Sequence, residues 1–184
     1  MDNETAPAAR SRRPLWIGLG TWVVMAGLVA LFAFGGDAEP DQGESRVLAK
    51  RVPPVAGTTM DGGYYDIDQS RGQWVVINFF ATWCPGCVDE HPELVAFEQQ
   101  VKSTGTGELI SVVFNDSTDR VAEFFAENGG DWPILQQPSL AVDFQVVQLP
   151  ETFLVAPDGT VTHRFQGPVT ANALWDAIRS VSQS

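Results

Sequence analysis

The two cysteines of this 184-residue chain, Cys84 and Cys87, are separated only by Pro85 and Gly86, and they follow an apolar run at residues 74–80. This order predicts a buried strand, a short turn and a helix that begins at the cysteines. Two thiols in the first turn of a helix can close a disulfide with little backbone movement. The positive end of the helix dipole then stabilises the thiolate of the first cysteine. These residue types at this spacing indicate a dithiol that is oxidised and reduced during catalysis.

A metal site and a structural disulfide are the alternatives. The chain has no second Cys-x-x-Cys, but His91 lies four residues after Cys87 and could complete a three-ligand cluster with both cysteines. Thiolates suit Cu(I), so a copper metallochaperone stays open as another function. A disulfide closing so short a loop constrains little of the unfolded chain, which argues against a purely structural role. The strand before the helix favours redox chemistry at a site without metal.

An uncharged stretch at residues 15–34 follows three arginines in the segment 10–13. At about 1.5 Å per residue, a helix of this length spans about 30 Å, the thickness of a bilayer core. The arginines predict a cytoplasmic N-terminus at residues 1–14 and an extracytoplasmic remainder. The small residues Gly36 and Ala38 would also suit cleavage of a signal peptide, but the length of the stretch favours a retained single-pass anchor.

The remainder of the chain, residues 35–184, is acidic, with 21 Asp and Glu against 8 Lys and Arg. This charge argues against nucleic acid and anionic lipid surfaces as partners. Residues 35–50 are rich in Gly, Asp, Glu, Gln and Ser and predict a flexible linker. Residues 51–184 are long enough for one compact domain with one core, and we expect a monomer.

Apolar periodicity and turn signals predict the order βαβα, then a ββ hairpin, then α, after a short N-terminal strand pair that turns near residues 60–64. This order gives an α/β fold whose mixed sheet has helices on both faces. The expected elements are strands at 75–80, 109–114, 152–155 and 161–165, and helices at 84–102, at 117 or 118 to 128, and near 171–178.

Two segments, 78–87 and 149–155, resemble thioredoxin-like proteins, and within them the membrane-anchored thiol-disulfide oxidoreductases of cytochrome c maturation (the TlpA-like or DsbE-like group). Pro92 matches the helix-kinking proline of such folds, and the N-terminal stretch matches the anchor of the group. The resemblance covers about residues 51–184 plus the anchor. It implies a thioredoxin-like fold with an N-terminal strand extension, preceded by one transmembrane helix.

The resemblance also implies roles for individual residues. Cys84 is expected to be the exposed nucleophile and Cys87 the buried resolving thiol, joined as the Cys84–Cys87 disulfide when oxidised. Pro150 is expected to follow a cis peptide bond and to face Cys84. The residues expected to contact the substrate are Trp83, Pro85, Gly86, Leu149, Pro150 and Glu151.

Proton transfer is where the chain departs from thioredoxin. Asn78 occupies the position of thioredoxin's buried aspartate, and an amide cannot titrate. Glu90, three residues after Cys87, matches an acidic residue of the anchored group. We expect Glu90 mainly, with Glu151, to accept the proton of Cys87 or to tune its pKa. His91 is expected on the helix surface or facing a partner.

The function implied is an extracytoplasmic disulfide reductase with no cofactor beyond its dithiol. It would receive electrons from a membrane thiol carrier and reduce apocytochrome c or a haem-handling protein, because haem attachment needs free thiols. The nearest alternative uses the same residues as a disulfide donor to exported proteins. The third is the copper metallochaperone, or a reductase of a copper-binding protein.

Overall fold

A computed structural model describes residues 47–183 of the chain. The predicted cytoplasmic segment and membrane anchor lie outside these residues, as does most of the predicted linker. Val47 is already packed in the hydrophobic core with 5% of its surface exposed, so the domain reaches into the range 35–50 that was expected to be linker. Within the described part of the chain, none of the helices combines the length and hydropathy that a membrane span needs.

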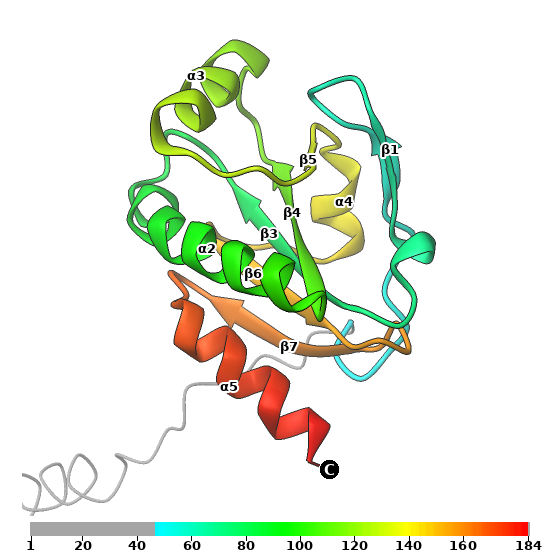
Figure 1. Ribbon diagram of the computed structural model, residues 1–184. Helices are drawn as coiled ribbons and strands as arrows, with labels where there is room; N and C mark the ends of the chain where they lie inside the picture. Colours follow the sequence, from blue (N-terminus) through cyan, green and yellow to red (C-terminus); the bar gives the residue numbers. More distant parts are fainter. Residues whose placement is uncertain (1–46, 184) are drawn as a thin grey trace, which may run out of the picture. The chain divides into compact units, whose positions relative to one another are not determined.

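A five-stranded mixed sheet forms the centre of the domain (Figure 1). Its strands are β3 (Trp74–Phe80), β4 (Gly107–Val113), β5 (Ile134–Leu135), β6 (Glu151–Val155) and β7 (Val161–Gln166). They lie in the order β5-β4-β3-β6-β7. β3 and β5 pair in parallel with β4, whereas β6 runs antiparallel to both β3 and β7. The predicted mixed sheet is therefore confirmed.

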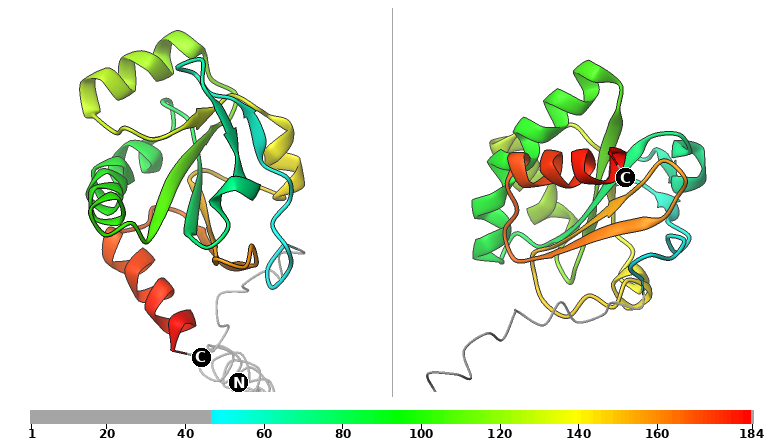
Figure 2. Two further views of the ribbon diagram at one scale, coloured as in Figure 1. Left: turned by 45° about the vertical axis from the view of Figure 1, so that its right-hand side comes forward. Right: turned by 90° about the horizontal axis from the view of Figure 1, so that it is seen from below.

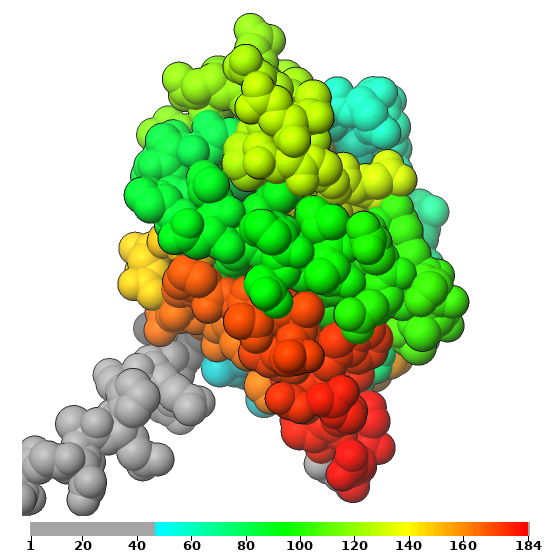
Figure 3. Space-filling view, turned by 60° about the vertical axis from the view of Figure 1, so that its left-hand side comes forward, coloured from blue at the N-terminus to red at the C-terminus, as the bar shows by residue number. Residues whose placement is uncertain are grey.

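Four α-helices of residues 47–183 lie around this sheet: α2 (Pro85–Thr104), α3 (Thr118–Asn128), α4 (Ser139–Asp143) and α5 (Ala171–Ser182). Figure 2 shows α2 and α5 on one side of the sheet and α4 on the other. The space-filling view shows α2 lying between α3 and α5 on its face of the molecule (Figure 3). Pro92 lies inside α2, and Ser117 caps α3 by accepting the N–H of Arg120.

A short hairpin precedes the sheet. Its strands are β1 (Ala56–Thr58) and β2 (Tyr64–Asp66), and the 3-10 helix η1 (Ile67–Ser70) follows. Gly62 in the turn has a φ of 85°, a conformation that glycine adopts without steric cost. The predicted strand pair with a turn near residues 60–64 is confirmed.

The alternation of side chains along β3 divides the core into two layers. Val75, Ile77 and Phe79 pack with the hairpin and α4, whereas Val76 packs with α2 and α5. Successive side chains of a strand point to opposite faces, so a strand covered on both sides reads as a continuous apolar run. This double coverage makes β3 the rigid support that ends just before the cysteines.

Candidate active site

The cysteines lie where β3 gives way to α2. Cys84 is the N-cap of α2, and its Sγ accepts the N–H of Cys87 at 3.2 Å. The two residues form a disulfide in this structure. Both are buried, with 4% of Cys84 and 3% of Cys87 exposed. The expectation of an exposed Cys84 is therefore wrong for the oxidised form, because neighbours such as Phe80 and Val113 pack around the disulfide.

What distinguishes the two sulfurs is an apolar groove of about 320 Å³. Cys84 lies in its wall and Cys87 does not. Trp83, which is 54% exposed, forms part of the same wall, and its Nε1 donates to the backbone oxygen of Asn115 at 3.0 Å. The lining residues are Trp83, Cys84, Pro85, Phe114, Val146, Val147, Gln148 and Leu149. A partner chain in this groove would meet Cys84 first.

Sequence reasoning missed the part of the groove formed by residues 146–148 and Phe114. The pair Val146-Val147 lies just before the expected substrate loop, and Val147 is 75% exposed. An apolar pair in a loop next to a predicted binding residue was the available signal. It carries no periodicity, so it was not recognised as part of a surface.

The loop that begins at Leu149 closes against the first turn of α2. The Leu149–Pro150 peptide bond is cis, as the resemblance implied. A Cβ atom added to Gly86 would lie 3.1 Å from Pro150 Cδ and 3.1 Å from Pro168 Cγ. Gly86 therefore lets the helix approach both proline rings closely.

Glu90 lies one helical turn after Cys87 and is only 2% exposed. Its Oε1 accepts the side-chain amide of Asn78 at 2.7 Å, and its Oε2 accepts the backbone N–H of Val169 at 2.9 Å. Burial raises the pKa of Glu90 to about 7, although both hydrogen bonds oppose the rise. A carboxyl group with this pKa can both accept and release a proton at neutral pH.

Glu151 lies in a different environment from Glu90. It is fully buried and forms an ion pair with Arg164 of β7. Its Oε2 accepts the N–H of Val147 at 3.1 Å, and Arg164 Nη2 donates to the backbone oxygen of Gln145 at 3.0 Å. Both oxygens of Glu151 have partners. These contacts link Glu151 to Val147 in one wall of the groove. Its expected part in proton transfer stays a prediction.

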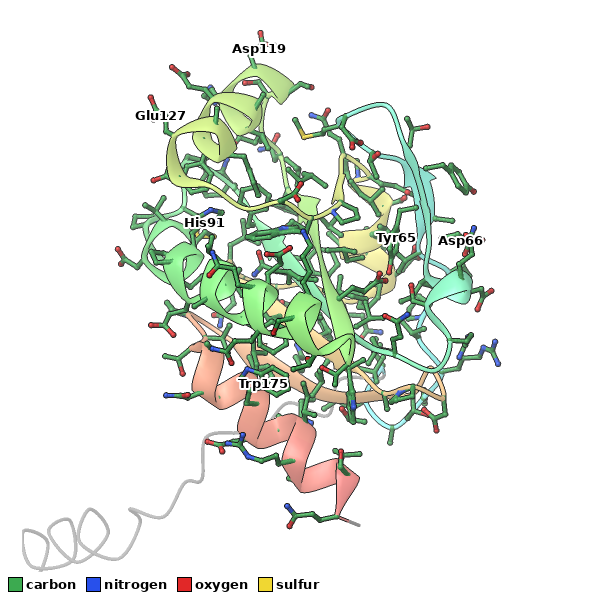
Figure 4. All side chains as sticks on the ribbon, in the orientation of Figure 1. Tyr65, Asp66, His91, Asp119, Glu127 and Trp175 are labelled. Carbon is green, nitrogen blue, oxygen red and sulfur yellow. A yellow bond between two sulfur atoms is a disulfide. The ribbon has the colours of Figure 1, made fainter. Side chains whose placement is uncertain are left out.

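His91 is buried, which contradicts its predicted place on the helix surface. It is 3% exposed and donates from Nε2 to the backbone oxygen of Gly129 at 2.8 Å. Its ring lies 4.7 Å from that of Phe124 and 5.1 Å from that of Phe125, on the side of α2 that faces α3 (Figure 4). The side of α3 that carries Phe124 and Phe125 covers this side of α2, and the sequence of α2 alone does not indicate it.

The three-ligand cluster considered for copper is not formed. In the part of the chain that the structure describes, no three His, Cys, Asp or Glu side chains are grouped so that they could hold a metal ion. The imidazole of His91 is engaged with Gly129, and burial lowers its pKa. The geometry that remains is that of a dithiol at a helix N-terminus, beside an apolar groove and a titrating carboxyl group.

Comparison with known proteins agrees with this geometry. The chain is 29% identical over 158 residues to the thiol:disulfide interchange protein HelX of Rhodobacter capsulatus. The matched residues make up 83% of this chain and 87% of HelX. It is 28% identical over 169 residues to the thiol:disulfide interchange protein DsbE of Vibrio cholerae, covering 88% and 89% of the two chains. The fold is similar to that of a secreted thiol-disulfide isomerase from Corynebacterium glutamicum, with a TM-score of 0.67 and 20% identity over 78% of this chain and 95% of that one.

The predicted thioredoxin-like fold and the predicted enzyme class are both confirmed by these similarities. The redoxin family matches residues 48–178, which is most of the chain and nearly all of the domain. The chain belongs to the redoxin family and is a thiol-disulfide oxidoreductase.

Proposed function

We propose that this domain reduces disulfides of exported proteins during cytochrome c maturation, with apocytochrome c or a haem-handling protein as its substrate. The Cys84–Cys87 pair is its redox centre, and the reaction uses no further cofactor. The observation that carries the proposal is the position of Cys84 in an uncharged groove, with Cys87 one helical turn before a buried carboxyl group whose pKa is about 7. The relatives HelX and DsbE are thiol:disulfide interchange proteins, which supports the same class of reaction.

The reaction proceeds in two exchanges. The thiolate of Cys84 attacks a disulfide of the substrate, forms a mixed disulfide with one substrate sulfur and releases the other as a thiolate. Cys87 then transfers its proton to Glu90 and attacks Cys84, which forms the Cys84–Cys87 disulfide and releases the second substrate sulfur. Two electrons pass to the substrate, and its thiolates take up protons from water and from Glu90.

The composition of the groove favours the reducing direction. A dithiol becomes a strong oxidant when its reduced form is stabilised. None of the groove-lining residues is charged, so no cation there stabilises the thiolate of Cys84. The N-terminus of α2 supplies the remaining stabilisation. A carboxylate at Glu90 would disfavour a thiolate at Cys87, so ionisation of the second thiol does not stabilise the reduced form either.

The proposed setting follows from the sequence. Residues 15–34 anchor the chain in the membrane with residues 1–14 in the cytoplasm, and the domain acts outside as a monomer. A membrane thiol carrier reduces the Cys84–Cys87 disulfide after each turnover, because the compartment itself is oxidising.

The reduction potential of the Cys84–Cys87 pair tests the direction. Equilibration of the full-length chain with glutathione or dithiothreitol is expected to give a value more negative than about −220 mV. A value near about −120 mV would identify a disulfide donor and overturn the proposal. The substrate is tested separately with a Cys87→Ser chain, which should trap oxidised apocytochrome c as a mixed disulfide through Cys84. If the measured potential is reducing but apocytochrome c is not trapped, only the choice of substrate is contradicted.

A further inference from the structure

A further buried carboxylate, that of Asp116, lies next to the active-site turn. Asp116 follows β4, and its side chain is fully buried. Its Oδ2 accepts both the backbone N–H of Thr82 at 2.7 Å and the hydroxyl of Thr82 at 2.6 Å. Its Oδ1 accepts from Arg120 Nε at 2.8 Å and from the N–H of Ser117 at 2.8 Å. The carboxylate therefore joins the segment that leads into Cys84 to the start of α3.

The backbone of the same loop holds Trp83. Asn115 accepts the indole N–H of Trp83 at 3.0 Å and has a φ of 48°, so the loop turns sharply at this point. Gln136 Nε2 donates to the backbone oxygen of Asp116 at 3.0 Å, which ties the loop to the chain after β5. Thr82 and Trp83 are thus attached to one anchored loop by three hydrogen bonds.

These bonds matter because the segment that they hold lies between a strand and a helix, where the hydrogen bond from Cys84 N–H to Ala81 O at 3.2 Å closes the turn. β3 ends at Phe80 and α2 begins at Pro85. Between them, Trp83 is half-exposed and forms a wall of the groove. Hydrogen bonds to an ionised group are stronger than neutral ones, and a buried N–H left without a partner is costly. Burial raises the pKa of Asp116, but the bonds from Thr82, Arg120 and Ser117 outweigh it and lower the pKa to about 2, so the carboxylate stays charged wherever thiols react.

We propose that Asp116 is a positioning residue that fixes Trp83 as the wall of the groove, so that exchange with a peptide substrate depends on it and exchange with a small disulfide does not. The inference rests on the proposed use of the groove for substrate binding. Asp116 does not touch the sulfur atoms. It acts through Thr82 and Trp83.

The test measures how fast Cys84 forms a mixed disulfide in a full-length Cys87→Ser chain in detergent. One probe is a peptide with an internal Cys-Ala-Ala-Cys-His disulfide flanked by apolar residues, and the other is hydroxyethyl disulfide. In each case the Cys84 thiolate bonds to one sulfur of the probe, and the other sulfur leaves as a thiolate. Asp116→Ala is expected to lower the rate constant for the peptide about tenfold, equivalent to about 1.4 kcal/mol, and to change that for hydroxyethyl disulfide less than about twofold.

Combination with Trp83→Ala separates positioning from general damage. If Asp116 acts through Trp83, the double variant reacts with the peptide as slowly as Trp83→Ala alone. Additive losses, or an equal loss with both probes, would overturn the inference. Thr82→Val keeps the backbone N–H and removes one hydrogen bond, so it should give a smaller loss of the same kind even if Asp116→Ala folds poorly.

Asp119→Ala is the matched control, because it removes a carboxylate from the exposed first turn of α3 (Figure 4) and should leave both rates unchanged. A loss there equal to that of Asp116→Ala would attribute the effect to charge alone and contradict the inference. The outcome for Trp83→Ala separates the two proposals. If it leaves the peptide rate unchanged, the groove does not bind substrate and both fail. If it slows the peptide while Asp116→Ala does not, only the role of Asp116 is wrong.

Discussion

The side-chain amide of Asn78 on β3 donates to Glu90 on α2 at 2.7 Å and also to the hydroxyl of Thr152 on β6 at 3.0 Å. An amide orients the carboxyl group without adding charge. An aspartate here would place two carboxyl groups in contact, and one of them would be forced to stay protonated. The neutral residue at this position therefore leaves Glu90 as a single titrating group.

Glu90→Gln should remove an ionisation from the second exchange. The carboxyl group must be ionised to accept the proton of Cys87, so the rate at which Cys87 resolves a mixed disulfide should rise with pH through about 7. Above pH 7, the Glu90→Gln variant should resolve the mixed disulfide about 100-fold more slowly than the wild type, which is the usual contribution of a general base. Its resolution rate should also lack the rise near pH 7. Single-turnover kinetics on a preformed mixed disulfide measure this rate. Asp89→Asn, on the exposed side of the same turn, is the control, and an unchanged profile for Glu90→Gln would exclude Glu90 as the base.

The same residue should make stability depend on pH. Its pKa is 4.5 in the unfolded chain and about 7 in the folded one, so between these values the folded chain binds more protons. The contribution of Glu90 to the free energy of unfolding should therefore be greatest below about pH 4.5 and fall by about 3 kcal/mol as the pH rises from there through about 7. Urea unfolding of the oxidised wild type and of Glu90→Gln, from pH 4.5 to 8, isolates this contribution as the difference between the two curves. Parallel curves would refute it.

The buried ion pair between Glu151 and Arg164 should be costly to break. Arg164→Met leaves the carboxylate buried without its cation, and we expect a loss of about 3 kcal/mol in the free energy of unfolding. The double variant Glu151→Gln/Arg164→Met should regain most of that loss, because neither charge is then left alone. Arg179→Met, which breaks the exposed pair with Asp176, should cost less than about 1 kcal/mol. Equal effects of Arg164→Met and Arg179→Met in urea unfolding would contradict this account.

Gly86→Ala tests the close approach of α2 to the two proline rings. Alanine is favoured in a helix by about 1 kcal/mol, but a methyl group at 3.1 Å from Pro150 and from Pro168 overpacks the site at a cost of about 1–3 kcal/mol. The second effect should prevail, with a net loss of about 1 kcal/mol in urea unfolding. Adding Pro168→Ala should relieve part of it. A Gly86→Ala protein that is more stable than the wild type would show that the segments carrying Pro150 and Pro168 move to accommodate the methyl group.

Much of the fold could be read from the sequence because its elements are long and periodic. The apolar run of β3 and the spaced apolar residues of α5 both predicted their elements within a few residues. β5 and α4 were missed because two and five residues are too few to show a period. They form only because the neighbouring strand and core residues such as Leu140 and Phe144 hold them in place.

The candidate site also has features that the sequence predicts and features that it does not. Cys84 and Cys87 could be located from the apolar run, the turn and the helix start around them, and Pro150 from the resemblance of its segment to a known family. The burial of His91 and the ion pair of Glu151 could not, because each depends on side chains of another element: α3 in the first case and Arg164 of β7 in the second. A helix that carries charge on most of its turns gives no hint of which side another helix will cover.

The pairing of β3 with β6 has a consequence for how the site is assembled. Asn78 lies opposite Thr152, and Phe79 lies opposite Glu151. A shift of β6 by one residue against β3 would turn Thr152 to the other face of the sheet, and the Asn78 amide would lose this partner. The site therefore exists only when two segments more than 70 residues apart have aligned correctly. For a domain expected to fold after export, the appearance of oxidoreductase activity would report correct strand alignment during folding.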